Sequence, residues 1–140
     1  MTSVELLKEA KKAREKSYSP YSHFAVGAAL LTADGSLFTG CNVENASYGA
    51  TCCAERVALF SAVAAGKTGF AALAVVGGEA GQEPDTPCPP CGICRQALSE
   101  FCPAGMRVYL CDGEGVKALR LGELLPFTFS TKQLENEEST

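Results

Sequence analysis

Cys53, Cys91 and Cys94 have the residue type and the spacing of a metal site. Cysteines three residues apart on the first turn of a helix point the same way, and the unsatisfied N–H groups and partial positive charge of that helix end stabilise thiolates. We expect Cys53 to begin another helix, so that two helix ends converge on one ion. Three protein ligands leave tetrahedral zinc an open position for water, as in catalytic sites. The sequence therefore predicts one zinc ion per chain.

Two further cysteines leave other zinc sites open. Cys52 and Cys88 lie beside these positions, so a closed site of four cysteines, in a zinc-stapled binding module without catalytic activity, also fits the count. The ligand pair could also shift back by three residues, to Cys88 and Cys91. Pro90 argues against this shift, because it restricts residue 89 away from the helical region. We therefore expect Cys52 and Cys88 to be free thiols.

Glu55 favours catalysis over a structural role. It follows Cys53 by two residues, and at the first turn of a helix a ligand and a carboxylate can both reach an ion beyond the helix end. A carboxylate there can take a proton from water and pass it to a leaving amine. A metal ligand, one residue and a glutamate, followed later by Pro-Cys-x-x-Cys, form the zinc-deaminase signature. Residues 53–55 (Cys-Ala-Glu) and 90–94 (Pro-Cys-Gly-Ile-Cys) match it.

The match extends beyond the zinc ligands, and the chain resembles the small homotetrameric cytidine deaminases from about Lys8 to Phe129. The segments that carry the resemblance are 18–30 (YSPYSHFAVGAAL), 40–48 (GCNVENASY), 53–56 (CAER) and 90–96 (PCGICRQ). The resemblance implies that cytidine and 2′-deoxycytidine are hydrolysed to uridine, 2′-deoxyuridine and ammonia in pyrimidine salvage. Glu55 would accept a proton from the attacking water and then protonate N3 of the ring and the departing amine. No organic cofactor is implied.

The same resemblance implies a set of substrate contacts. Asn42 and Glu44 would hold the ribose 3′-hydroxyl, and such a pair does offer a donor and acceptors for it. Phe24 would pack against the pyrimidine, and Ala46 would offer its backbone to the base. The other expected members of the site are Ala54 for substrate, Phe129 in a neighbouring subunit's pocket, and Arg56 beside the zinc ligands.

Arg56 has a separate physical argument. Three thiolates on Zn²⁺ leave a net charge of −1, and a guanidinium can hydrogen-bond the sulfurs and offset it. Simpler roles exist for these residues: a surface salt bridge for Arg56, a solvated strand end for Asn42 and Glu44, and a core position for Phe24.

Periodicity and turn signals predict the elements that position these residues. The expected helices are 2–18, 53–65 (ended by Gly66), 91–101 and a turn at 122–125, and the expected strands are 24–32, 37–43, 70–77, 107–111 and 116–121. An Asp-Gly turn makes the first two strands a hairpin, and a short turn makes the last two antiparallel. This order predicts an α/β fold of three layers, α-β-α, around a mixed five-stranded sheet. Residues 1–140 form a single domain, with a flexible tail from about 131.

Composition restricts partners and compartment. The net charge of −4 provides no basic stripe for nucleic acid. The longest apolar run, residues 70–76, is too short for a bilayer, which needs about 20 residues. The first residues lack the apolar core of a signal peptide, so we expect a cytoplasmic protein in which clustered cysteines bind metal. A nucleic-acid deaminase and a deaminase of a cytosine-containing antibiotic remain alternatives.

The expected partners are a small nucleoside, water and further copies of the chain. Nothing in the sequence closes the far side of the inferred pocket, and residues 124–129 (Leu-Leu-Pro-Phe-Thr-Phe) are strongly apolar for a segment so near the C-terminus. Symmetric homo-oligomers are common among enzymes of this size. We therefore expect a homotetramer of 222-type symmetry.

Overall fold

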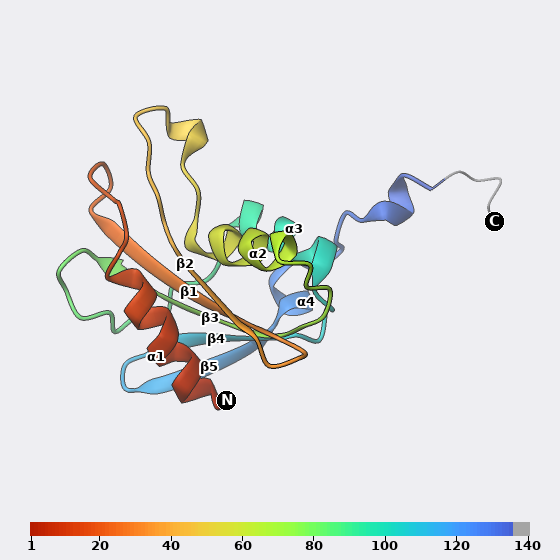
Figure 1. The fold of residues 1–140 in the computed structure, drawn as a ribbon, viewed down its shortest axis with the longest axis horizontal. Coiled ribbons are helices and arrows are strands. Elements are labelled where there is room, and N and C mark those ends of the chain that lie inside the picture. The colour runs from red at the N-terminus through yellow and green to blue at the C-terminus, as the bar shows by residue number, and fades with distance from the viewer. Residues whose placement is uncertain (136–140) are drawn as a thin grey trace.

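A five-stranded sheet with helices on both faces forms the body of the chain in this computed structural model (Figure 1). The structure describes residues 1–135; the last part of the expected flexible tail, residues 136–140, lies outside the described residues. The elements, in chain order, are α1 (Ser3–Arg14), β1 (Phe24–Thr32), β2 (Leu37–Cys41), η1 (Tyr48–Ala50), α2 (Ala54–Ala64), β3 (Phe70–Glu79), α3 (Gly92–Phe101), β4 (Arg107–Asp112), β5 (Gly115–Arg120), α4 (Leu121–Leu124) and η2 (Thr131–Gln133).

The strand order is β2-β1-β3-β4-β5. The hairpins β1–β2 and β4–β5 are antiparallel, as the turn signals predict. β1 also pairs with β3 antiparallel, and β3 pairs with β4 in parallel through the crossover helix α3. The mixed sheet and its α/β class are therefore confirmed.

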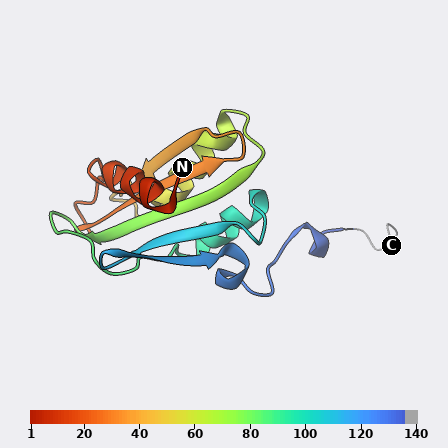
Figure 2. The ribbon, with the colours of Figure 1, turned by 90° about the horizontal axis from the view of Figure 1, so that it is seen from below.

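The two faces of the sheet carry separate apolar clusters. Leu6 and Ala10 of α1 pack with Ala29 of β1 on one face. The other face packs against α2 and α3, where Leu59 and Leu98 are fully buried. Figure 2 shows the sheet between the two helical layers. This arrangement confirms the three layers, and it places the N-terminal ends of α2 and α3 on the same side.

α1 begins with the capping box expected from Thr2 and Glu5, but it ends at Arg14 and not near Tyr18. The side chain of Arg14 turns back onto the sheet and donates to the carbonyl oxygens of Ala25 (2.8 Å), Gly78 (3.1 Å) and Glu79 (2.8 Å). The chain then leaves the helix, and the N–H of Tyr18 donates to Asn42 O at 3.0 Å. The expected helical extension was therefore wrong, because these contacts replace its last turn.

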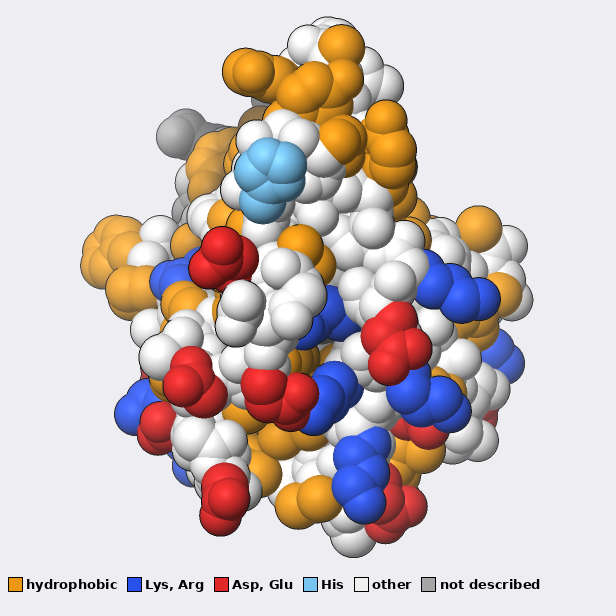
Figure 3. Space-filling model, turned by 90° about the vertical axis from the view of Figure 1, so that its left-hand side faces the viewer, with side chains coloured by type: hydrophobic (Ala, Val, Ile, Leu, Met, Phe, Trp, Pro, Cys, Tyr) orange, Lys and Arg blue, Asp and Glu red, His pale blue; other side chains and the backbone are white. Residues whose placement is uncertain are grey.

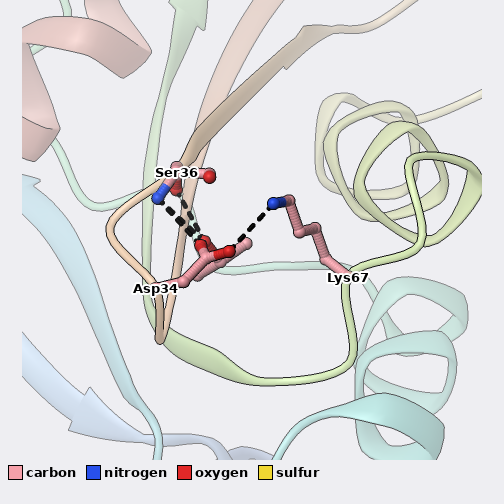
Figure 4. A network of polar contacts seen from close by, with 4 residues as sticks. Asp34, Ser36 and Lys67 are labelled. Carbon is pink, nitrogen blue, oxygen red and sulfur yellow. Dashed lines mark hydrogen bonds and ion pairs between the residues drawn. The ribbon is translucent and has the colours of Figure 1, made fainter.

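A polar network joins the β1–β2 hairpin to the end of α2 (Figure 4). Asp34 accepts hydrogen bonds from Lys67 Nζ (2.8 Å) and Ser36 N (3.1 Å), and also from the hydroxyl of Thr32. These bonds hold the pKa of Asp34 well below its usual range, with Lys67 as the largest cause. Gly66, in the left-handed conformation at φ 84°, ends α2 as predicted. The network fixes one end of the layer that carries Cys53 and Glu55.

Within residues 1–135, no helix combines the length and the apolar character needed to cross a bilayer.

Candidate active site

Three cysteine sulfurs meet where α2 and α3 begin. Cys53 is the N-cap of α2, Cys91 is the N-cap of α3, and Cys94 is buried in the first turn of α3. The sulfur of Cys91 lies 3.6 Å from that of Cys53 and 3.4 Å from that of Cys94. All three ligand atoms lie within 4.8 Å of one another. Tetrahedral zinc with Zn–S bonds of about 2.3 Å separates its sulfurs by roughly 3.8 Å, so the cluster fits this ion.

Arg56 stands beside this cluster. Its Nη2 lies 3.4 Å from the sulfur of Cys53 and donates to it. A hydrogen bond from Cys94 and the nearby guanidinium of Arg56 lower the pKa of Cys53. The contact with Cys53, together with burial, raises the pKa of Cys94. The cluster therefore already contains one thiol that ionises readily, next to a cation that offsets its charge.

Glu55 lies in the first turn of α2 and is only 4% exposed. Burial is the largest cause that raises the pKa of its carboxyl group, and negative charge on Cys53 raises it further. The start of α2 packs directly against β2 because residue 40 is glycine. A Cβ at this position would lie only 2.5 Å from the carbonyl oxygen of Ala54. A carboxyl with a raised pKa can both accept and return a proton near neutral pH.

A cavity of about 330 Å³ opens next to the cysteines and Glu55. Cys53, Glu55 and Cys91 line its chemical end, together with Ala54. Its other lining residues form an apolar wall and a polar end: Phe24, Val26, Cys88 and Pro89 for the wall, and Asn42, Glu44, Ser22 and Thr51 for the polar end. A larger hollow of about 470 Å³ lies between α1 and the β4–β5 turn, far from this cluster in the fold, and Lys11 and Glu83 on its rim pair with each other.

The polar end is fixed by hydrogen bonds to the main chain. Asn42 donates from Nδ2 to Phe24 O at 2.8 Å and accepts at Oδ1 from Val26 N at 2.9 Å. Glu44 Oε1 accepts from Tyr21 N (3.0 Å) and Ser22 N (3.1 Å). The hydroxyl of Ser22 also donates to Glu44 and is the largest cause that lowers the pKa of this carboxyl group. Glu44 thus faces the cavity as a carboxylate.

Two residues expected at the site, Ala46 and Phe129, are not among the residues that line the cavity within this chain. Ala46 is exposed and is not among the residues that line the cavity. Phe129 is 57% exposed on the segment after α4, where its carbonyl oxygen accepts from Gln96 Nε2 at 3.0 Å. Figures 1 and 2 both show this segment leaving the body of the chain. Contact between Phe129 and substrate therefore requires another copy of the chain.

Sequence reasoning missed four lining residues. Val26 could have been predicted from the sequence. It lies two residues after Phe24 on the same strand, so both side chains share a face, and Phe24 was already expected at the site. Ser22, Thr51 and Pro89 lie on loops and carry no periodic signal.

Cys88 forms no disulfide and lies in the wall of the cavity, and its sulfur is outside the three-sulfur cluster. Its sulfur would lie 2.6 Å from a Cβ at Gly77, so the glycine makes room for it. Burial raises the pKa of Cys88 to about 11, and the charge of Glu55 acts in the same direction. Cys88 is therefore a neutral, compact wall of the cavity. Cys52 is also free and half-buried.

The family model described as the cytidine and deoxycytidylate deaminase zinc-binding region matches residues 1–111. A cytidine deaminase of Halalkalibacterium halodurans is 48% identical over 132 residues, 94% of this chain and 96% of that relative. A cytidine deaminase of Sporosarcina psychrophila is 49% identical over 135 residues, with 96% of each chain covered. The crystal structure of a cytidine deaminase from Burkholderia pseudomallei aligns with a TM-score of 0.82 at 51% identity, over 92% of this chain and all of that one.

Proposed function

The chain belongs to the zinc-binding cytidine and deoxycytidylate deaminase family, and from this premise we propose that it hydrolyses cytidine and 2′-deoxycytidine in pyrimidine salvage. The products are uridine or 2′-deoxyuridine and ammonia. One observation carries the proposal: the buried carboxyl group of Glu55 lines the same cavity as Cys53 and Cys91, whose sulfurs belong to the zinc cluster. A zinc site with only a structural role would not require a buried carboxyl group beside it.

Cys53, Cys91 and Cys94 hold one zinc ion in this proposal. When bound, zinc lowers the pKa of a coordinated water to about 7 and so supplies a nucleophile at neutral pH. Arg56 offsets the charge of the three thiolates through its bond to Cys53. Glu55 takes the proton that the attacking water releases.

Glu55 then returns protons to the substrate. It protonates N3 as the C4–O bond forms, and it later carries the proton of the new hydroxyl group to the amine as the C4–N bond breaks. Burial raises the pKa of Glu55 above its ordinary value, which makes its carboxylate a stronger base toward the attacking water than an exposed glutamate would be. Its burial keeps bulk water from these exchanges.

The far end of the cavity binds the sugar. Asn42 offers a donor and Glu44 an acceptor, so a ribose 3′-hydroxyl that both accepts and donates suits the pair. Phe24 packs against the pyrimidine, with Ala54 at the chemical end and the backbone of Ala46 toward the base. A polar site of this kind rejects analogues that lack the hydroxyl, because its buried groups lose their partners.

We further propose a cytoplasmic homotetramer. Eight cysteines with no disulfide among them suit a reducing compartment. Figure 3 shows hydrophobic side chains gathered at the top of the molecule, over the connection between β2 and α2, where Tyr48 is 76% exposed and Val43 45%. Such a patch favours contact with another copy. Lower on that face, acidic and basic side chains are interspersed, which disfavours a nucleic-acid partner there.

The test is the loss of cytidine absorbance when purified protein is added, with ammonia measured in parallel. We expect one ammonia per uridine formed, loss of activity with a zinc chelator, and recovery when zinc is returned. Cytidine and 2′-deoxycytidine should both be consumed. Zinc-loaded protein that leaves both nucleosides unchanged would contradict the proposal and favour the binding module.

A further inference from the structure

The side-chain amide of Asn42 is held by three neighbours. Besides its bonds to Phe24 O and Val26 N, its Oδ1 lies 2.5 Å from the hydroxyl of Ser17. Asn42 is only 8% exposed and is one of the residues that line the cavity. The orientation of the amide is fixed by β1, because a flipped group would place its NH₂ against the N–H of Val26 and its oxygen against the carbonyl of Phe24.

The hydrogen-bonding capacity of this amide can be counted. A carbonyl oxygen has two lone pairs, and Val26 N and Ser17 Oγ occupy both. The NH₂ group has two hydrogens, and Phe24 O takes one. One N–H is left for a ligand. Since Oδ1 cannot donate, the hydroxyl of Ser17 must be the donor in their contact.

We propose that Ser17 is a positioning residue for sugar recognition, because its hydroxyl fills the last lone pair of Asn42 and leaves this residue only a donor for the cavity. Ser17 lies on the α1–β1 connection and does not line the cavity, so it acts through Asn42 alone. The sugar hydroxyl must then accept from Asn42 and donate to Glu44. This inference rests on the proposed nucleoside deaminase function.

The experiment measures kcat and KM for 2′-deoxycytidine, and kcat/KM at high enzyme concentration for 2′,3′-dideoxycytidine, a poor substrate because it lacks the 3′-hydroxyl. Without the hydroxyl of Ser17, the amide of Asn42 loses one of its three hydrogen bonds and is held less firmly, so Ser17→Ala should raise the KM for 2′-deoxycytidine about two- to tenfold with little change in kcat. The kcat/KM for the dideoxy compound should not change. Ser17→Thr, which keeps the hydroxyl, should restore the wild-type KM.

Ser19→Ala is the matched control, because Ser19 contacts the hydroxyl of Ser17 at 3.2 Å but has no recorded bond to Asn42. It should behave as wild type with both substrates. Equal losses with both substrates in Ser17→Ala, or no loss with either, would overturn the inference while the deaminase function stands. A wild-type protein that converts neither substrate would overturn the function and this inference with it.

Discussion

The guanidinium of Arg56 donates to the sulfur of Cys53 across 3.4 Å, three residues along the chain. The Nε of the same side chain is buried and has no hydrogen-bond partner within residues 1–135. An unsatisfied buried donor is costly, and it lies next to a cluster that becomes anionic when its thiols ionise. This pairing places Arg56 beside the three-cysteine cluster, where we propose that it offsets the charge of the zinc ligands.

Arg56→Gln should weaken zinc binding. The variant keeps a polar side chain but removes the positive charge, and the loss of a group that supports metal ligands typically costs about 10- to 100-fold in affinity. Competition with a chromophoric chelator measures the change. Arg107→Gln, at an exposed position on β4, should bind zinc as wild type does. Equal zinc affinity in the two variants would contradict this role for Arg56.

Glu55→Gln should abolish deamination and leave about one zinc per chain. The amide is similar in size but cannot accept the proton of water, and general acid–base catalysis alone is worth about 10²- to 10⁴-fold. Turnover of cytidine and zinc content by atomic emission are measured on the same sample. Glu100→Gln, at the exposed end of α3, serves as the control and should retain activity. Near-normal activity in Glu55→Gln would remove this residue from the mechanism.

The cysteine variants separate the two possible ligand pairs. Cys88→Ser should keep zinc and activity, because the sulfur of Cys88 is outside the three-sulfur cluster. Cys94→Ser should lose both, and the start of α3 should lose order with the metal, since zinc binding and local folding are linked. Zinc content and circular dichroism are the measurements. If Cys88→Ser loses its zinc while Cys94→Ser retains it, the ligand pair is the shifted one.

The parts of this molecule that sequence predicts best are those set by local rules. The N-cap positions of Cys53 and Cys91 follow from helix-start signals, and the hairpin follows from Asp34-Gly35. Both helix starts carry the chemistry, so the zinc cluster and Glu55 could be recognised before any coordinates. The match to the deaminase signature depends on these short-range spacings alone.

The remaining parts depend on contacts between distant segments. The end of α1 is decided by Arg14, which bonds Ala25 and Glu79, and the sequence around residue 14 does not contain that information. Ser17 and Ser22 reach Asn42 and Glu44 from a loop with no periodicity. Such loop paths follow from tertiary packing, and sequence patterns indicate only where a loop occurs.

Burial of Glu55 should also reduce stability at neutral pH. Its pKa is raised in the folded chain above the ordinary value of 4.5, so folding favours the protonated acid. The resulting destabilisation is absent well below pH 4.5, grows as pH rises toward the folded-state pKa, and is constant above it. Glu55→Gln should therefore raise the melting temperature at pH 7–8, and the gain should shrink as pH falls toward 5.

Thermal unfolding of protein from which the metal has been removed measures the effect across this pH range, because a bound cation beside Glu55 would itself lower the pKa of this carboxyl group. Glu100→Gln is again the control, because this side chain is exposed, and it should change the melting temperature little at any pH. A gain for Glu55→Gln that is the same at pH 5 and pH 8 would show that titration of the buried carboxyl group is not its cause.

Phe129 should complete the site of a neighbouring subunit. It is 57% exposed, and Phe127 beside it is fully exposed, although burial of each such side chain is worth about 1.5–3 kcal/mol. A partner that covers this segment would recover that free energy.

Light scattering should therefore report about four times 14.6 kDa. Phe129→Ala should raise the KM for cytidine more than it lowers the melting temperature. Val4→Ala, which truncates an exposed apolar residue of α1, should change neither. A monomer that is fully active in dilute solution would contradict the shared site, and the zinc chemistry would be unaffected.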